Sequence, residues 1–281
     1  MEELEAQEGL DRLLEKEKKR FAGVELTGKT LGVVGLGNIG SLVANMGLAL
    51  GMNVIGYDPA ISVEAAWRLS SDVEKMDNLS SLFGRADYIS LHLPVLDSTR
   101  AIVNDGLLSG AKENLVLLNF ARGEIVDESA ILKALEDGRV HRYVSDFPTN
   151  ETLRHPKILQ MPHIGASTGE AEENCAVMVA DQLISFLENG NVRNSVNFPQ
   201  IELPRTTPVR LTITNRNVPK VLNQITAIIA EHEINIVDML NKSRDQIAYN
   251  IIDLEACPSD TAIAALEAID EVVNLRVIGP C

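Results

Sequence analysis

The chain has 281 residues, of which 45% are apolar, and a formal net charge of −15. That length allows two domains with cores of their own. The negative charge disfavours a general role in binding nucleic acid or an anionic membrane surface, so an anionic ligand must be held by local basic residues. No stretch approaches the roughly 20 consecutive apolar residues that span a bilayer.

The cysteines and the start of the chain indicate a reducing compartment. Cys175, Cys257 and Cys281 are widely spaced and form no metal-ligand pattern, so we expect no metal site. Cys175 fits the apolar face of a helix and is expected to be a core thiol. The acidic start, Met1-Glu2-Glu3, does not resemble a secretion signal, and a cytoplasmic location is the expectation.

Residues 1–25 are interpreted as a first segment that contains one exposed helix over residues 1–20. This stretch is acidic at its start and basic at its end. That order of charges is favourable for the helix dipole. Its few leucines cannot form a core of their own.

A glycine motif follows directly after the apolar run Leu31–Val34 and before the helix-like stretch Ser41–Leu50. A strand, this motif and a helix in succession predict a dinucleotide-binding turn. The alternative is an ordinary glycine-rich turn between a strand and a helix. The motif reads Gly35-Leu36-Gly37-Asn38-Ile39-Gly40.

Each glycine of the motif has a physical task. Gly35 allows the tight turn out of the strand, and Gly37 lets backbone N–H groups approach a pyrophosphate at the start of the helix. Gly40 lets the helix pack closely on the strand. Asp58, at the end of the second apolar run, can accept a hydrogen bond from a ribose hydroxyl and would repel a 2′-phosphate. The expected cofactor is therefore NAD rather than NADP.

Apolar runs alternate with helical stretches as far as about Ile164. Consecutive apolar residues are typical of strands that are covered on both faces, and the βαβα order predicts a doubly wound parallel sheet over residues 26–168. Gly138 is interpreted as the end of the helix Ser129–Asp137. The expected strands are Leu31–Val34, Asn53–Tyr57, Tyr88–Leu93, Leu115–Phe120, Tyr143–Ser145 and Ile158–Met161.

The second half of the chain predicts a long helix and a smaller domain. Residues 169–190 have apolar side chains at helical spacing, within a segment 169–197, and the prolines of residues 198–207 indicate a linker. Residues 208–281 read as βαββαβ, a ferredoxin-like unit. Its expected elements are Val209–Thr214, Val218–His232, Ile234–Asn241, Ala248–Leu254, Ser259–Ile269 and Val272–Ile278.

Three ionisable residues lie near the ends of the later expected strands, where doubly wound folds place their sites. His163 is suited to take the proton from a hydroxyl that loses hydride to nicotinamide. Glu151 is a carboxylate that could orient this ring, and Arg122 could hold a substrate carboxylate in a bidentate manner. Singly each residue has an ordinary structural interpretation, so the prediction depends on all three together.

These motifs resemble the D-2-hydroxyacid dehydrogenase family over nearly the whole chain, from about Lys16 onward. The resemblance implies that Arg122 binds the substrate carboxylate, that His163 is the acid/base and that Glu151 is its partner. It also implies that Asp146 and the backbone of Phe120 and Ala121 meet the nicotinamide amide. The matching segments are Leu26–Gly40, Leu118–Asp127, Asp146–Glu151 and Met161–Thr168.

The same resemblance completes the expected cofactor site. It implies that Leu93, Pro94 and Thr99 line the adenosine side. One local departure lies after Asp146, where the family usually has one further residue before Phe147, so the path of this loop can differ. The cofactor residues expected from motif and resemblance together are Gly35, Gly37, Asn38, Ile39, Gly40, Asp58, Leu93, Pro94, Thr99, Phe120, Ala121, Arg122, Asp146, His163 and Gly165.

Residues 208–281 resemble an ACT domain, the amino-acid-sensing module of many family members that oxidise 3-phosphoglycerate. By this resemblance Asn217 and Asn235 would bind an L-serine effector, since amide groups both donate and accept hydrogen bonds. The family often has histidine in place of Asn215 and glycine in place of Lys220. A dimerisation module without a ligand is the equally weighted alternative.

The resemblance implies oxidation of 3-phosphoglycerate with NAD, as the first step of serine biosynthesis, in a dimer or tetramer. Family members carry roughly one hundred residues ahead of the cofactor domain, which build most of a substrate domain. Only a short segment precedes Leu31 here, so an incomplete substrate domain is expected. The alternatives are a fragment that binds NAD and an amino acid without turnover, a dehydrogenase of another 2-hydroxy acid, and, remotely, a redox-sensing corepressor.

Overall fold

The structure, a computed structural model, describes residues 10–281. It contains two compact units, Met1–Gly165 and Ala166–Cys281. Of the helix expected over residues 1–20, the structure describes α1 (Leu10–Glu17), which continues into a short 3₁₀ helix, η1 (Lys18–Phe21). The first nine residues of that expectation lie outside the described residues.

The first unit contains a seven-stranded sheet with the order β3-β2-β1-β4-β5-β6-β7, in which every ladder is parallel. This confirms the predicted doubly wound sheet. The short edge strand β3 was not predicted, because two exposed residues leave no apolar signal. The strands are β1 (Thr30–Val34), β2 (Asn53–Tyr57), β3 (Glu74–Lys75), β4 (Tyr88–Leu91), β5 (Leu115–Asn119), β6 (Val140–Ser145) and β7 (Ile158–Gln160).

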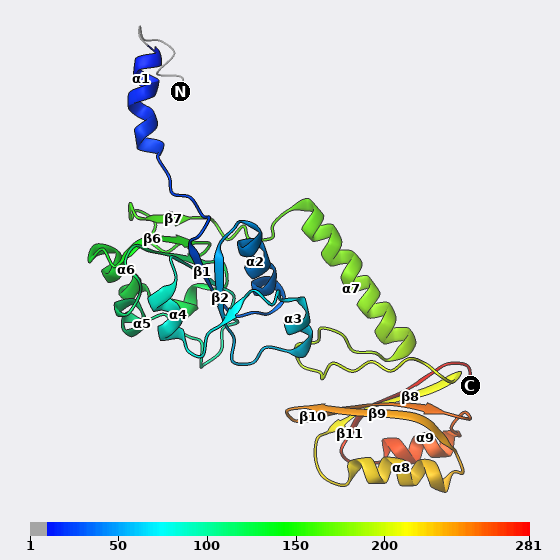
Figure 1. Cartoon of the computed structure of the whole chain (residues 1–281). Helices are drawn as coiled ribbons and strands as arrows, with labels where there is room; N and C mark the ends of the chain where they lie inside the picture. The colour runs from blue at the N-terminus through cyan, green and yellow to red at the C-terminus, as the bar shows by residue number, and fades with distance from the viewer. Residues whose placement is uncertain (1–9) are drawn as a thin grey trace. The chain divides into compact units, whose positions relative to one another are not determined.

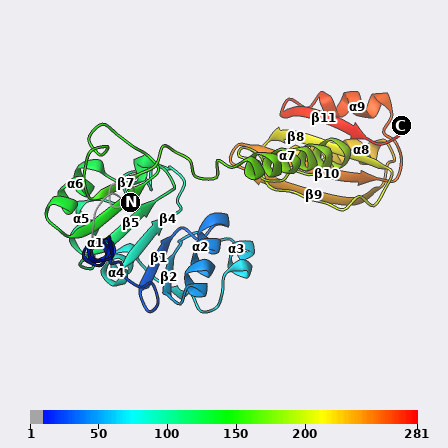
Figure 2. The ribbon, with the colours of Figure 1, turned by 90° about the horizontal axis from the view of Figure 1, so that it is seen from above.

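Helices cover both faces of this sheet. Within β1, Val33 belongs to one apolar cluster and Val34 to another, which places a core on each side. Figure 2 shows α2 and α3 together beside β2, and α5 beside β5, and α6 contacts β6. The helices are α2 (Asn38–Ala49), α3 (Val63–Arg68), α4 (Leu79–Arg85), α5 (Asp105–Ser109), the 3₁₀ helix η2 (Gly123–Ile125) and α6 (Glu128–Glu136).

Local sequence explains where most of these helices begin and end. Side-chain oxygens of Ser62, Asn78, Asn104 and Asp127 accept a hydrogen bond from the backbone N–H three residues later, at the starts of α3, α4, α5 and α6. Gly138 follows α6 with φ 75°, as its interpretation as a helix stop predicts. Helix α2 differs, because Gly37 precedes it and provides no side-chain cap.

The second unit contains an antiparallel sheet with the order β11-β8-β10-β9. Helices α8 and α9 lie on the same side of this sheet (Figure 1), and the topology is the predicted βαββαβ unit. The observed elements are β8 (Val209–Arg216), α8 (Val221–Glu231), β9 (Ile236–Arg244), β10 (Ile247–Leu254), α9 (Asp260–Glu267) and β11 (Val272–Ile278).

The long helix α7 (Gly169–Asn189) begins at a side-chain cap from Thr168 and ends at Gly190, whose φ is 70°. The predicted length is correct, but the prediction that Cys175 lies in a core is wrong, because its thiol is exposed. None of the described residues of α7 is buried. Helical periodicity identifies an apolar face but not the surface that covers it.

Only the end of α7 packs firmly within the second unit. Phe186 packs with Tyr249 and Ile251 on the sheet face opposite α8 and α9. Ile201, in the segment expected as a linker, is fully buried in the same cluster and forms a β-bridge with Val192. The segment 198–207 therefore contacts the sheet along its length rather than spanning between units.

A buried ion pair holds the end of α7 and the segment that follows it against the sheet. Arg210 and Asp253 are both completely buried, and the guanidinium donates to both carboxylate oxygens at 2.6 and 2.8 Å. Arg210 also donates to the carbonyls of Asn189, Leu203 and Pro204. One side chain thus supplies partners to the end of α7 and to the segment that follows it.

The cysteines at the C-terminal end also differ from the prediction. Cys257 and Cys281 form a disulfide, with Cα atoms 5.6 Å apart, whereas the sequence interpretation expects reduced thiols. The two residues are 24 positions apart. The return of the chain through α9 and β11 brings them together, which spacing in the sequence does not reveal.

Candidate cofactor and catalytic site

The glycine motif forms the turn between β1 and α2. Gly35 has φ 88°, and a Cβ on it would lie 2.5 Å from the carbonyl oxygen of His92. A Cβ on Gly40 would lie 1.8 Å from the carbonyl oxygen of Gly35, so helix and turn are in direct contact. A Cβ on Gly37 would meet nothing within 4 Å. The packing roles of Gly35 and Gly40 are thus internal, and the space in front of Gly37 is open to a ligand.

Asp58 follows the neighbouring strand β2 and holds the glycine turn through a hydrogen bond. One carboxylate oxygen accepts a 2.8 Å hydrogen bond from the backbone N–H of Leu36, and the other accepts from Ala60 at 2.9 Å. Each oxygen has a second lone pair, so the carboxylate can still accept from a ribose hydroxyl. The uncapped start of α2 and this acid fit the diphosphate and the ribose of a dinucleotide.

A cleft of about 360 Å³ lies beside this turn, at the carboxyl ends of β1, β4 and β5. That is the edge where parallel α/β sheets bind their ligands. Thr99, expected nearby, uses its hydroxyl within its own loop by donating to the carbonyl of Pro94 at 2.6 Å. The predicted residues that line the cleft are Ile39, Leu93, Pro94, Phe120, Ala121 and Arg122.

The loop that carries Arg122 is organised by a buried residue that the sequence reasoning missed. Asn119 is fully buried at the end of β5, accepts a hydrogen bond from Ala121 N–H and donates to the carbonyl of Arg122. Its amide also donates to the hydroxyl of Tyr143. A polar residue at the end of an apolar strand was the available signal. Arg122 itself is exposed.

His163 occupies a constrained loop. Its backbone has φ 56°, a region that side-chain-bearing residues rarely adopt. Asp146, only 1% exposed, accepts hydrogen bonds from the backbone N–H groups of Ile164 and Gly165 at 2.8 and 2.7 Å. The ring of Phe147 lies 5.0 Å from the His163 ring, centroid to centroid. The structure therefore gives Asp146 the task of fixing the histidine loop.

Glu151 is an exposed residue in the turn after β6. No hydrogen bond or ion pair joins it to His163 in the described part of the chain. The turn is held by Thr149 and the buried Thr152, whose hydroxyls lie 2.9 Å apart. The structure thus brings Arg122 into the cleft and fixes His163, but it does not pair Glu151 with the histidine.

His92, which is not among the predicted site residues, also lines the cleft. Its Nε2 lies 2.9 Å from the hydroxyl of Ser90. Burial lowers the pKa of His92 to about 4, so its ring is neutral at neutral pH. A neutral imidazole at this position leaves the cleft without a further positive charge.

The second unit holds the residues expected to bind an amino acid, and it places them far apart. Strands β8 and β9 both pair antiparallel with β10, so they run in the same direction. Asn217 follows the end of β8, whereas Asn235 precedes the start of β9. The two ends of β10 that they adjoin, Ile247 and Leu254, are separated by roughly 24 Å at 3.4 Å per residue. One copy of this domain cannot bring both amides to one small ligand.

Two departures from the ACT pattern have visible consequences. Asn215 is 4% exposed, and its side chain bonds to Asn250 and to the carbonyl of Arg216. Lys220 has φ 78°, the conformation that glycine adopts without strain. Asn215 is therefore committed to an internal network, and the preference for glycine at position 220 has a backbone reason.

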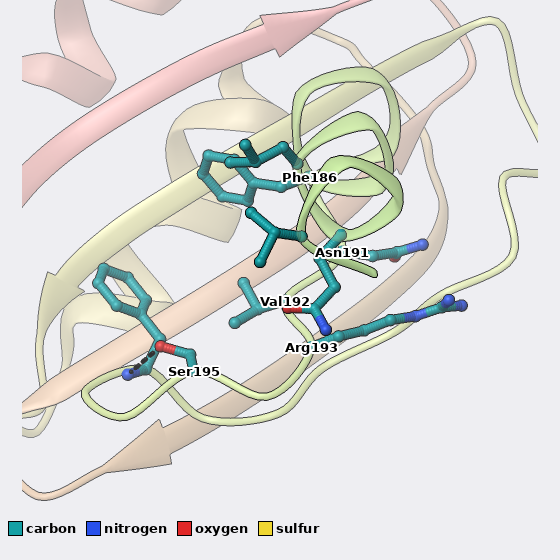
Figure 3. Close-up of a pocket in the computed structure, with 9 residues that line it drawn as sticks. Phe186, Asn191, Val192, Arg193 and Ser195 are labelled. Atoms are coloured by element: carbon teal, nitrogen blue, oxygen red, sulfur yellow. Dashed lines mark hydrogen bonds between the residues drawn. The ribbon is translucent and has the colours of Figure 1, made fainter. Parts of the chain in front are cut away.

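A further cavity of about 280 Å³ lies in the second unit, between α7 and residues 191–198 (Figure 3). Phe186, Val192 and Phe198 make most of it apolar. Its one charged lining residue, Arg193, is paired with Glu202 at 2.6 Å. This cavity offers no acid, base or free charge for hydride chemistry.

Within residues 10–281, no helix is both long and apolar enough to cross a membrane. The same described residues contain no group of three or more His, Cys, Asp or Glu side chains that could hold a metal ion.

A doubly wound parallel sheet with an uncapped glycine turn, an acid on the next strand and a cleft at the carboxyl edge defines a dinucleotide-binding domain. Residues 3–167 match the family model for the NAD-binding domain of D-isomer specific 2-hydroxyacid dehydrogenases. The chain belongs to this family, and its cofactor is NAD. Family members are NAD-dependent oxidoreductases that act on the CH–OH group of 2-hydroxy acids.

Curated relatives and solved structures agree with this membership. A D-3-phosphoglycerate dehydrogenase of Haemophilus influenzae is 33% identical over 90% of this chain and 64% of its own length. The D-3-phosphoglycerate dehydrogenase of Methanocaldococcus jannaschii is 37% identical over 80% of this chain and 43% of its own length. The NAD complex of a D-isomer specific 2-hydroxyacid dehydrogenase from Lactobacillus delbrueckii ssp. bulgaricus is 28% identical, with a TM-score of 0.56, over 64% of this chain and 59% of that one. The chain thus spans less than two thirds of these relatives.

Proposed function

We propose that this chain carries the cofactor site and the catalytic groups of an enzyme that oxidises 3-phosphoglycerate to 3-phosphohydroxypyruvate with NAD, in the cytoplasm, as the first step of L-serine biosynthesis. The observation that supports it best is the cleft that joins Arg122 to the glycine turn, at the same carboxyl edge of the sheet at which the constrained loop of His163 follows β7. The names of the curated relatives support the choice of substrate. The proposed domains are 26–168 for NAD, 169–197 for the return helix and 208–281 for regulation.

In this proposal Arg122 binds the substrate carboxylate as a bidentate guanidinium and thereby orients the carbon that loses hydride. His163 accepts the hydroxyl proton at its imidazole, and Glu151 stabilises the resulting imidazolium once the loop after β6 brings it close. NAD supplies the hydride acceptor. Asp146 keeps the histidine loop in place through its bonds to Ile164 and Gly165.

A second candidate is a chain that binds NAD without turnover. Arg122, Glu151 and His163 are all exposed, and water that reaches such groups weakens their electrostatic effect on a substrate. The deciding experiment measures NADH formation from 3-phosphoglycerate beside calorimetric titration with NAD. Turnover that His163→Ala lowers by at least about 1,000-fold, with NAD affinity retained, supports the enzyme. NAD binding without turnover supports the second candidate. If the chain neither binds NAD nor forms NADH, both candidates are contradicted.

The ACT-like unit is proposed to bind L-serine between two copies of the chain. Asn217 and Asn235 lie at opposite ends of one sheet, so a site that uses both needs a neighbouring domain. A homo-oligomer, dimer or tetramer, follows from this arrangement. Sedimentation with and without L-serine tests it: we expect serine to favour the oligomer in the parent and not in Asn235→Ala. Serine binding to a monomer would contradict the shared site.

A further inference from the structure

Arg68 reaches the glycine turn from a neighbouring helix. It is the last residue of α3, and its guanidinium donates a 2.9 Å hydrogen bond to the side-chain oxygen of Asn38, the first residue of α2. Helices α2 and α3 lie side by side in both views (Figures 1 and 2). A contact across 30 positions thus places a positive charge beside the backbone that faces the cofactor's diphosphate.

A second asparagine of α2 holds the backbone of this segment. Asn45 donates to the carbonyl of Arg68 at 2.8 Å and accepts from the N–H of Ser70 at 3.0 Å. Asn38 and Asn45 are seven residues apart, close to two helical turns, and therefore lie on one face of α2. The amide of Asn45 fixes the backbone at Arg68, and the amide of Asn38 orients its guanidinium.

The electrostatics of the turn make a cation favourable there. The chain has a net charge of −15, and the carboxylate of Asp58 is bonded to the turn itself at Leu36. A diphosphate brings further negative charge to the same place. Among the described residues, Arg68 is the one basic side chain with a hydrogen bond to residues 35–40. A guanidinium can bond phosphate oxygens in a bidentate manner and still retain a donor for an amide.

We propose that Arg68 binds the pyrophosphate of NAD, and that Asn38 and Asn45 act as positioning residues for it. The proposal rests on the NAD site described above. It makes α3 part of the cofactor site, although the glycine motif and its acid lie outside that helix. Arg68 then compensates for the repulsion that the acidic chain and Asp58 exert on the diphosphate.

The test is calorimetric titration of the full chain with NAD, ADP-ribose, adenosine and NADP. In Arg68→Gln we expect the dissociation constants of NAD and ADP-ribose to rise about tenfold, as for loss of one charged hydrogen bond. Adenosine binding should not change, because adenosine lacks a phosphate. The difference between parent and variant should shrink in about 0.5 M salt, and Arg68→Lys should restore part of the affinity.

Two further variants separate a cofactor role from a purely structural one. Arg142→Gln removes the same charge from the exposed start of β6, away from the cleft, and should leave all four affinities unchanged. Asn45→Ala removes the backbone anchor and should weaken NAD and ADP-ribose by about threefold, less than the loss of the guanidinium itself.

The outcomes distinguish the possibilities. A parent chain that does not bind NAD would overturn the proposed function. If the parent binds NAD and Arg68→Gln leaves NAD and ADP-ribose unchanged, the assignment of Arg68 is wrong while the function stands. Weakening of NADP alone would mean that Arg68 reads a 2′-phosphate. An equal loss for adenosine, with a lowered melting temperature, would mean that it only joins α3 to α2.

Discussion

Asp146 accepts a 2.7 Å hydrogen bond from the backbone N–H of Gly165, and a Cβ on Gly165 would lie 2.9 Å from the same carboxylate oxygen. The carboxylate is almost fully buried and also accepts from Ile164. His163 lies two residues before Gly165 and has a left-handed backbone conformation, which these hydrogen bonds maintain. The acid at the end of β6 therefore determines where the proposed acid/base lies.

Removing this acceptor should loosen the histidine loop. In Asp146→Ala, two N–H groups in partly buried hydrogen bonds lose their charged partner, so we expect a loss of about 2–4 kcal/mol in the free energy of unfolding. Urea unfolding at neutral pH measures it. Asp97→Ala, at an exposed acid of the same unit, should change stability by less than about 0.5 kcal/mol. Equal effects of the two substitutions would show that Asp146 does not hold the loop.

The glycines of the turn should respond differently to an added methyl group. Gly40→Ala creates a contact with the carbonyl oxygen of Gly35 that the helix can relieve only by shifting, so stability should fall by at least about 2 kcal/mol. Gly37→Ala meets no protein atom, so the fold should lose less than about 1 kcal/mol while NAD binding weakens more than tenfold. Melting temperature and NAD calorimetry on both variants test the contrast, and unchanged NAD affinity in Gly37→Ala would contradict the proposed position of the diphosphate.

His92 should make the chain less stable in mild acid. Burial lowers its pKa to about 4, whereas an unfolded histidine titrates near 6.5. The unfolded chain therefore binds the proton more readily than the folded chain. This group leaves the free energy of unfolding unchanged above about pH 7 and lowers it increasingly toward pH 4. The difference between pH 8 and pH 5 is about 2 kcal/mol for this residue. His92→Gln should reduce the pH dependence of urea unfolding by that amount, and an identical pH profile would contradict the shift.

The pair Arg210–Asp253 should dominate the stability of the second unit. Burial raises the pKa of Asp253, but the hydrogen bonds from Arg210 and Thr206 outweigh it and hold the pKa below its ordinary value. The ionised carboxylate thus stabilises the fold at neutral pH, and this contribution is lost as the pH falls below about 4 through the lowered pKa. Asp253→Asn should cost about 3–5 kcal/mol near pH 7. Its deficit relative to the parent should shrink in acid.

Arg210→Met should cost more than Asp253→Asn, because three backbone carbonyls lose their donor in addition to the carboxylate. Thermal unfolding of both variants compares them. A smaller effect for Arg210→Met would show that the carbonyl contacts contribute little.

Lys220→Gly should stabilise the chain. Lys220 has φ 78° just before α8, and a residue with a Cβ pays roughly 1 kcal/mol or more in that conformation. Glycine removes this strain but adds freedom to the unfolded chain, so the net gain should be near 0.5–1 kcal/mol. Chemical denaturation measures it. Lys220→Ala keeps the Cβ and is the matched control, and an equal gain there would assign the effect to the lysine side chain instead.

Much of the fold follows from local patterns. Runs such as Asn53–Tyr57 have the bounds of β2, because strands buried on both faces need consecutive apolar residues. Gly138 and Gly190 have the left-handed backbone that ends a helix. The βαββαβ order of the last 74 or so residues is equally local, since each element has its own period. Strand β3, two exposed residues long, has no such signal.

Contacts between distant segments were not predictable in this way. The disulfide between Cys257 and Cys281, the exposed thiol of Cys175 and the separation of Asn217 from Asn235 all depend on how the chain returns on itself. The missing bond between Glu151 and His163 depends on the course of one turn. Periodicity indicates that a face is apolar or that a motif is present, and it does not state what lies opposite.

The sequence by itself determined the cofactor: glycines at 35, 37 and 40 and the acid Asp58 are read within one βαβ unit, where chain order and spatial order coincide. The tertiary structure alone decided which side chains surround that motif. Arg68 reaches it from a helix 30 positions away, and Asp146 fixes the histidine loop from a neighbouring strand. The reason is physical: a local pattern encodes backbone conformation and burial, whereas a hydrogen bond needs two atoms within about 3 Å, and only packing sets that distance.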